Sequence, residues 1–109
     1  MLHSFSHNDM IHMIRKNFRN RFSLFDATDF TKYPLGASPG FLGSDGITHT
    51  DINRMRTGKL GGQFWAVYGN CTTQGKDAVR FYFEQLDSLK RLFKRYPDTF
   101  QFASTANGR

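Results

Sequence analysis

The apolar residues of this chain gather in four segments, two with the character of strands and two with the periodicity of helices. The strand-like segments are residues 1–7 and 61–68, and the second is hydrophobic on both faces near its middle, which is typical of a buried parallel strand. The helix-like segments run from about residue 9 to residue 18 and from about residue 76 to residue 96. Strands that alternate with helices predict βαβ units and a parallel sheet.

The segment between the first helix and the second strand is long and rich in turn residues. Glycine and proline punctuate residues 22–49, so we predict an irregular loop there. The glycines lack a phosphate-binding spacing after a strand, and we assign no nucleotide site. A short helix should follow, with Thr50 as its N-cap and Gly58 at its end. A weak alternation at residues 99–103 indicates the start of another strand.

Two βα units make a poor domain on their own, because a two-stranded parallel pair leaves its sheet edges and one face open. With 109 residues, the chain is long enough for one small domain or for a piece of a larger one. Its twelve phenylalanines favour a packed core over disorder. We therefore interpret the chain as the opening of a larger α/β domain.

The charge and hydropathy of the chain argue against nucleic acid as a partner and against a transmembrane helix. The net charge is +6, but the basic residues are spread thinly, and those of residues 90–95 alternate with apolar ones as on the solvated side of a helix. No nucleic-acid-binding motif accompanies them, so we expect no nucleic-acid partner. No apolar stretch approaches the roughly 20 residues of a transmembrane helix. Residues 1–7 have neither the basic start nor the apolar core of a signal peptide.

The single cysteine, Cys71, has no partner for a disulfide within this chain. It is either a buried thiol or half of a bridge whose other half lies elsewhere. Asn70-Cys71-Thr72 matches the acceptor pattern for N-linked glycosylation, which matters only if the protein is secreted.

The candidate chemistry begins at His7-Asn8-Asp9, where the first apolar run ends. Residues i and i+2 of a strand point to the same face, so His7 and Asp9 should present a nitrogen and an oxygen to one point in space. Zinc accepts imidazole and carboxylate ligands. The tripeptide therefore indicates a metal site, although the same pattern also arises by chance. His12 projects from the first turn of the following helix, where a lone histidine is more often partly exposed and idle than functional.

Three stretches of the sequence resemble the membrane (renal) dipeptidase family of zinc-dependent peptidases. His7-Asn8-Asp9 resembles the opening His-Asn-Asp of the family. The match is dense from about residue 48 to residue 100 and includes the specific string Gly61-Gly62-Gln63-Phe64-Trp65. It continues without a gap through Cys71-Thr72-Thr73-Gln74-Gly75-Lys76-Asp77. The resemblance covers most of this chain but only about the first third of a family member.

The resemblance implies that residues 1–109 are the N-terminal part of a single barrel domain, namely the first two βα units of a (β/α)₈ TIM barrel with its active site at the C-terminal strand ends. His7 and Asp9 would bind the first of two zinc ions. The metal pair would serve the hydrolysis of a dipeptide's amide bond. Cys71 would be half of an intradomain disulfide, which fits a cell-surface or secreted protein. Family members are commonly dimeric and held to the membrane by a glycolipid anchor.

Two departures from the family accompany the match. Phe5-Ser6 stands where the family usually has an acidic residue and a glycine before the histidine. His12 stands where the family often has an aromatic residue near the substrate, which makes His12 a candidate for substrate contact.

The resemblance also implies that this chain holds no complete catalytic site. The family takes a bridging glutamate and further histidines from later strands, and Glu84 lies on an outer helix in the match. Two protein ligands do not hold a catalytic zinc pair, since even one catalytic zinc usually takes three. We therefore expect the chain by itself to be inactive. The alternative is a truncated, non-catalytic product that acts as a binding module.

Overall fold

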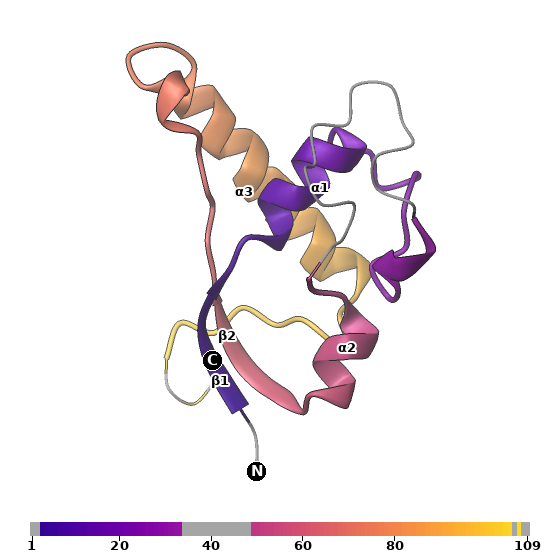
Figure 1. The fold of residues 1–109 in the computed structure, drawn as a ribbon. Helices are drawn as coiled ribbons and strands as arrows, with labels where there is room; N and C mark the ends of the chain where they lie inside the picture. Colours follow the sequence, from indigo (N-terminus) through magenta and orange to yellow (C-terminus); the bar gives the residue numbers. More distant parts are fainter. Residues whose placement is uncertain (1–2, 34–48, 106, 108–109) are drawn as a thin grey trace. The chain divides into compact units, whose positions relative to one another are not determined.

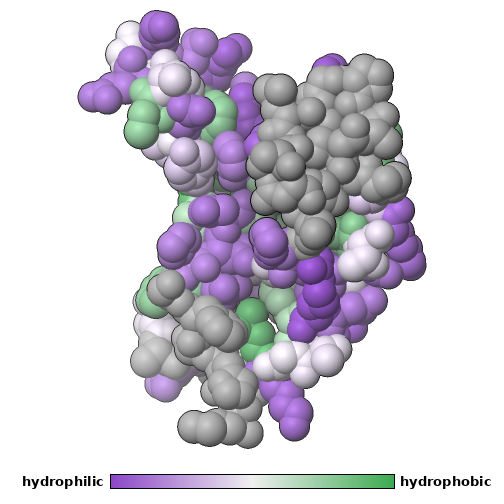
Figure 2. All heavy atoms as spheres, in the orientation of Figure 1, coloured by the Kyte–Doolittle hydropathy of each residue, from purple (hydrophilic) through white to green (hydrophobic). Residues whose placement is uncertain are grey.

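The structure is a computed structural model that describes residues 3–33, 49–105 and 107 (Figure 1). It divides into two units, Met1–Tyr68 and Gly69–Arg109, and each is described by itself. The second unit contains the longest helix, α3 (Ala78–Arg95). On the face drawn in Figure 2, hydrophilic side chains make up most of the described surface, and hydrophobic ones appear among them.

The first unit contains a parallel pair of strands, β1 (His3–Asn8) and β2 (Leu60–Trp65). They run side by side in Figure 1, with Asn8 opposite Trp65 and a register irregularity between Phe5 and Asn8. The predicted parallel pairing is confirmed. The expectation of a second strand buried on both faces is wrong, because 77% of Phe64 is exposed. The described residues form a two-stranded sheet, whereas a parallel strand buried on both faces belongs to a sheet that is covered by helices on each side.

Helix α1 (Met10–Phe18) follows β1 directly and confirms the predicted first helix. Its apolar stripe is buried through Met10, Ile11, Ile14 and Phe18. The helix ends where Arg19 adopts a left-handed conformation (φ 51°) and donates its backbone N–H to the carbonyl of Arg15. This is a common way for a helix to terminate, although glycine is the usual residue there.

Residues 22–33, predicted as loop, form an aromatic cluster. The ring centroids of Phe18 and Phe25 lie 4.9 Å apart, and Phe30 stacks on Phe18 at 5.8 Å. Tyr33 meets Phe18 edge-on at 5.5 Å. A short 3₁₀ helix, η1 (Phe30–Lys32), lies within this segment. The rest of the predicted loop up to residue 48 lies outside the described residues.

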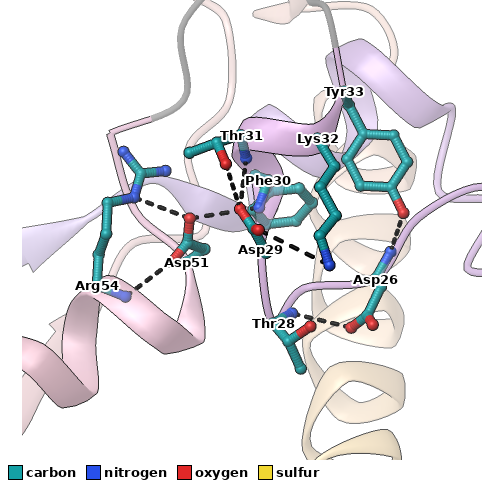
Figure 3. Close-up of polar contacts among 9 residues, drawn as sticks. All are labelled: Asp26, Thr28, Asp29, Phe30, Thr31, Lys32, Tyr33, Asp51 and Arg54. Atoms are coloured by element: carbon teal, nitrogen blue, oxygen red, sulfur yellow. Dashed lines mark hydrogen bonds and ion pairs between the residues drawn. The ribbon is translucent and has the colours of Figure 1, made fainter.

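The buried carboxylate of Asp51 joins this segment to helix α2 (Ile52–Thr57) (Figure 3). Asp51 is 1% exposed. Its oxygens accept hydrogen bonds from the backbone N–H of Phe30 (3.3 Å) and from the backbone N–H and Nε of Arg54 (both 2.8 Å). Asp51 is therefore the N-cap of α2, and the prediction of Thr50 in that role is wrong. Gly58 ends the helix as predicted.

In the second unit, a 3₁₀ turn, η2 (Cys71–Thr73), precedes α3. The predicted long helix is confirmed, with its first turn starting at Ala78. Its buried residues are Gln85, Ser88 and Leu92.

The predicted third strand at residues 99–103 is absent from the described part of the chain. The backbone N–H groups of Thr99 and Phe100 both donate to the carbonyl of Tyr96, each at 3.0 Å. These bonds make a turn after the helix, and the ring of Phe100 stacks on Phe93 with centroids 6.0 Å apart. The weak alternation of the sequence is overridden because those amides are already used locally.

Candidate metal and substrate site

The candidate site begins at the carboxyl end of β1, where exposed and half-buried residues alternate. His7 and Asp9 are exposed and Asn8 between them is half-buried. His7 is a strand residue, and Asp9 is the N-cap of α1. Both candidate ligands are therefore open to solvent at this strand end. That the imidazole and the carboxylate lie on one side of the backbone stays a prediction.

The backbone at this strand end is held in place mainly through Asn8. The Nδ2 of Asn8 donates to the Oγ1 of Thr50 at 2.6 Å, and its Oδ1 accepts from the backbone N–H of Met10 at 2.7 Å. The carbonyl of Asn8 also accepts the backbone N–H of Ala66, at 3.0 Å. Asn8 is thus tied to the sheet, to α1 and to Thr50, and the two flanking residues are left open to solvent.

Gln63 on β2 supports the same strand end. Its Nε2 donates to the carbonyl of His7 at 3.4 Å. Its Oε1 is buried and finds no hydrogen-bond partner among the described residues. A buried polar atom without a partner costs free energy, so a ligand that donates a hydrogen bond at this point would be favoured.

The residues at the strand end are of the types that bind zinc, but there are too few of them for a catalytic zinc site. An imidazole nitrogen and a carboxylate oxygen are normal zinc ligands, but a catalytic zinc ion usually has three ligands from the protein. Within the described ranges, no group of three histidine, cysteine, aspartate or glutamate side chains lies close enough to hold a metal ion. His7 and Asp9 can therefore contribute to a zinc site but do not build one.

His12, three residues after Asp9 on α1, packs against Tyr68. Their rings meet edge to face with centroids 4.7 Å apart. The Nδ1 of His12 is buried without a hydrogen-bond partner in the described part of the chain. Burial lowers the pKa of His12 below 6.5, and the charges of Lys16 and Arg15 lower it further, while the charge of Asp9 opposes them. The imidazole is therefore neutral at neutral pH.

The remaining predicted site residues lie in the second unit. Asn70 and Cys71 are exposed, and the thiol of Cys71 is free. Whether Cys71 forms a disulfide in a longer protein stays a prediction. Glu84 lies 4.0 Å from the Nε of Arg80, one turn earlier on α3, and belongs to a string of surface ion pairs.

Sequence reasoning did not find three residues of this region: Thr50 as partner of Asn8, Gln63 as support of His7, and Tyr68 as partner of His12. Each acts through a contact between residues at least 42 positions apart. A local pattern cannot report such contacts. The sequence offered one indication. Asn8 lies between two candidate ligands, and neighbouring residues of a strand point to opposite faces, so Asn8 is expected to have other partners than His7 and Asp9.

No helix in the described part of the chain is both long and apolar enough to cross a membrane.

Comparison with known proteins gives one family and a set of relatives. A family model described as membrane dipeptidase (peptidase family M19) matches residues 5–108. Dipeptidase 3 of Mus musculus and Dipeptidase 3 of Rattus norvegicus are each 31% identical to this chain over 102 residues. Those alignments cover 94% of this chain but 17% and 18% of the two relatives, so the chain spans about a sixth of their length.

Proposed function

We propose that this chain, which belongs to the membrane dipeptidase family, carries two of the metal ligands of a zinc-dependent dipeptidase. The observation that carries the proposal is the strand end at His7-Asn8-Asp9. A histidine and an aspartate are exposed there on either side of an asparagine that is tied to three neighbours. The family match covers this tripeptide and nearly all of the chain.

The proposed reaction is hydrolysis of the single amide bond of a dipeptide. Bound zinc would polarise the scissile carbonyl and supply a hydroxide near neutral pH. The chain's own part is to hold the metal through the imidazole of His7 and the carboxylate of Asp9, and to keep both in position through Asn8. His12 is proposed to contact the substrate, because it lies three residues after Asp9, in the first turn of the helix that follows the strand end.

The proposed fold is a (β/α)₈ barrel to which residues 1–109 contribute two βα units of a single domain. The parallel pairing of β1 with β2 and the helix after each strand support this proposal. Residues outside this chain would then supply the remaining zinc ligands, a second zinc ion's site and the partner of Cys71. A homodimer, a lipid anchor and a cell-surface or secreted location are further proposals drawn from the family.

The test uses a product in which this chain is followed by the rest of its coding sequence. We expect it to hydrolyse dipeptides, to lose activity on chelation and to regain it with zinc. His7→Gln and Asp9→Asn should each lower kcat/KM by at least about a hundredfold, because each removes a ligand that the metal needs. Asp98→Asn, an equal loss of charge at an exposed position after α3, is the matched control.

Two results would contradict the proposal. Activity that survives both chelation and the loss of His7 and Asp9 would exclude the zinc mechanism. A chain whose natural product supplies no further histidine or glutamate ligands would favour the alternative, a non-catalytic binding module.

A further inference from the structure

The acceptor pattern Asn70-Cys71-Thr72 lies in the second unit, at the turn before α3. Of the six asparagines in the chain, only Asn70 is followed two residues later by serine or threonine. Asn70, Cys71 and Thr72 are all exposed. The pattern Asn-X-Ser/Thr is common by chance, so exposure and the use of each polar atom decide whether the site can be modified.

The two polar atoms of the Asn70 side chain are used differently. Its Oδ1 accepts hydrogen bonds from the backbone N–H of Thr72 (2.9 Å) and from the Oγ1 of Thr72 (3.0 Å). Its Nδ2 donates no hydrogen bond among the described residues. The folded turn therefore depends on the oxygen of the amide of this exposed residue, and the nitrogen makes no hydrogen bond among the described residues.

We propose that Asn70 is an acceptor for an N-linked oligosaccharide. In this step a bond forms between Nδ2 and the anomeric carbon of a sugar carried on a lipid pyrophosphate. The bond from that carbon to the pyrophosphate oxygen breaks, the lipid pyrophosphate leaves, and Nδ2 loses one proton. The amide oxygen is unchanged, so both hydrogen bonds from Thr72 persist in the glycosylated turn.

The inference depends on export of the chain, which belongs to the proposed function, but not on zinc or catalysis. Glycosylation without dipeptidase activity would leave this inference standing, and activity without glycosylation would overturn it alone. The two proposals can therefore fail separately.

The experiment is translation of the whole chain behind a cleavable signal sequence, in the presence of microsomes. A reporter acceptor site in an appended tail shows that the chain has entered the lumen. We expect one mass increase beyond the reporter's, removed by endoglycosidase H. Asn70→Gln and Thr72→Val should each abolish it, while Thr73→Val should keep it. Thr73 is the matched control, since its hydroxyl bonds only to the carbonyl of Asn70.

The outcomes are decisive in both directions. Absence of the extra increase while the reporter is glycosylated would overturn the proposal, as would an increase that persists in Asn70→Gln. In protein from the natural source, trypsin should release residues 60–76 as one peptide. Deglycosylation in heavy-oxygen water should label Asn70 in that peptide. Quantitative recovery of the unmodified peptide would also overturn the proposal.

Discussion

At the scale of single residues, the candidate site depends on the hydrogen bonds of one asparagine. Asn8 uses both its side-chain amide and its backbone carbonyl in hydrogen bonds, to Thr50, Met10 and Ala66. The positions of His7 and Asp9 follow from that anchoring. Thr50 contacts neither His7 nor Asp9 in the described contacts. A substitution at Thr50 should nevertheless weaken metal binding, because Thr50 holds Asn8 in place.

Replacing Thr50 with valine removes the acceptor for the Nδ2 of Asn8 while keeping the shape of the side chain. We expect the free energy of unfolding to fall by about 1–2 kcal/mol, because a part-buried amide is left unpaired. We also expect weaker zinc binding, measured as the shift of the His7 imidazole signals in a zinc titration by NMR. Thr57→Val, at an exposed position on α2, is the control. Equal zinc affinity in Thr50→Val and the unaltered chain would contradict the proposed role of Asn8.

The second residue-scale prediction concerns the pH dependence that His12 gives to stability. Its pKa is below the usual 6.5 in the fold, chiefly because of burial. As the pH falls below about 6.5, the unfolded chain therefore takes up the proton first, and stability is lost as the pH falls through the lowered pKa. His12→Phe keeps an aromatic contact with Tyr68 but does not titrate.

We expect unfolding by urea to show a smaller loss of stability in His12→Phe than in the unaltered chain between pH of about 7.5 and about 5. NMR should place the titration of His12 below 6.5. A His12 that titrates at or above that value would show that the contact with Tyr68 does not exclude solvent from the ring.

At the scale of elements, Asp51 connects α2 to the aromatic segment before it. One buried carboxylate caps α2, pairs with Arg54 and accepts the N–H of Phe30. Next to it, the N–H groups of Ile52 and Asn53 donate to the carbonyls of Ala27 and Thr28. The segment that looks like loop in sequence is thereby fixed to the start of a helix.

Asp51→Ala should lower the free energy of unfolding by about 2–3 kcal/mol, because it removes a helix cap and leaves buried donors without an acceptor. Asp51→Asn should cost less, since an amide oxygen can still cap the helix. Asp98→Asn should change stability by less than about 0.5 kcal/mol, as expected of an exposed site. If Asp51→Ala and Asp98→Asn cost the same, the buried hydrogen bonds are not contributing to stability.

The order of elements could be predicted from the sequence because it depends on local patterns. Alternating and helical periodicities located β1, α1, β2 and α3. That His7 and Asp9 bind one metal ion stays a prediction.

The sequence predicted Thr50 as the cap of α2, but Asp51 takes that role through the backbone N–H of Arg54. Asp51 also accepts the N–H of Phe30, 21 residues away, and a local pattern cannot report that contact. The aromatic cluster could not be predicted either. Its rings have no regular spacing, and the turn residues around them favoured a loop.

At the scale of the whole molecule, both units expose large apolar side chains. Phe64 in the first unit and Phe83 in the second are 77% and 69% exposed, and Val79 on α3 is 70% exposed. Monomeric soluble proteins seldom leave such groups in large contiguous patches. In the proposed barrel, further elements would cover side chains of this kind.

The isolated chain should therefore self-associate. We expect its apparent mass in sedimentation to rise with protein concentration, and the double variant Phe64→Lys with Phe83→Lys to reduce that rise. Thr57→Lys with Gln74→Lys, which adds the same charge at two exposed polar positions, separates loss of apolar surface from added repulsion. Association that both double variants suppress equally would mean that charge, rather than exposed phenylalanine, controls it.

The pairing of β1 with β2 also has a consequence for the order in which the chain folds. The first strand leaves the ribosome early, yet its hydrogen-bonding partner begins at Leu60. The two ends of a long loop must come together before this pairing can stabilise the chain, which costs conformational entropy. Contacts between residues far apart in the sequence therefore form slowly. Until residues 60–65 are synthesised, β1 therefore has no strand to pair with, and its backbone N–H and C=O groups can pair with the edge of another strand.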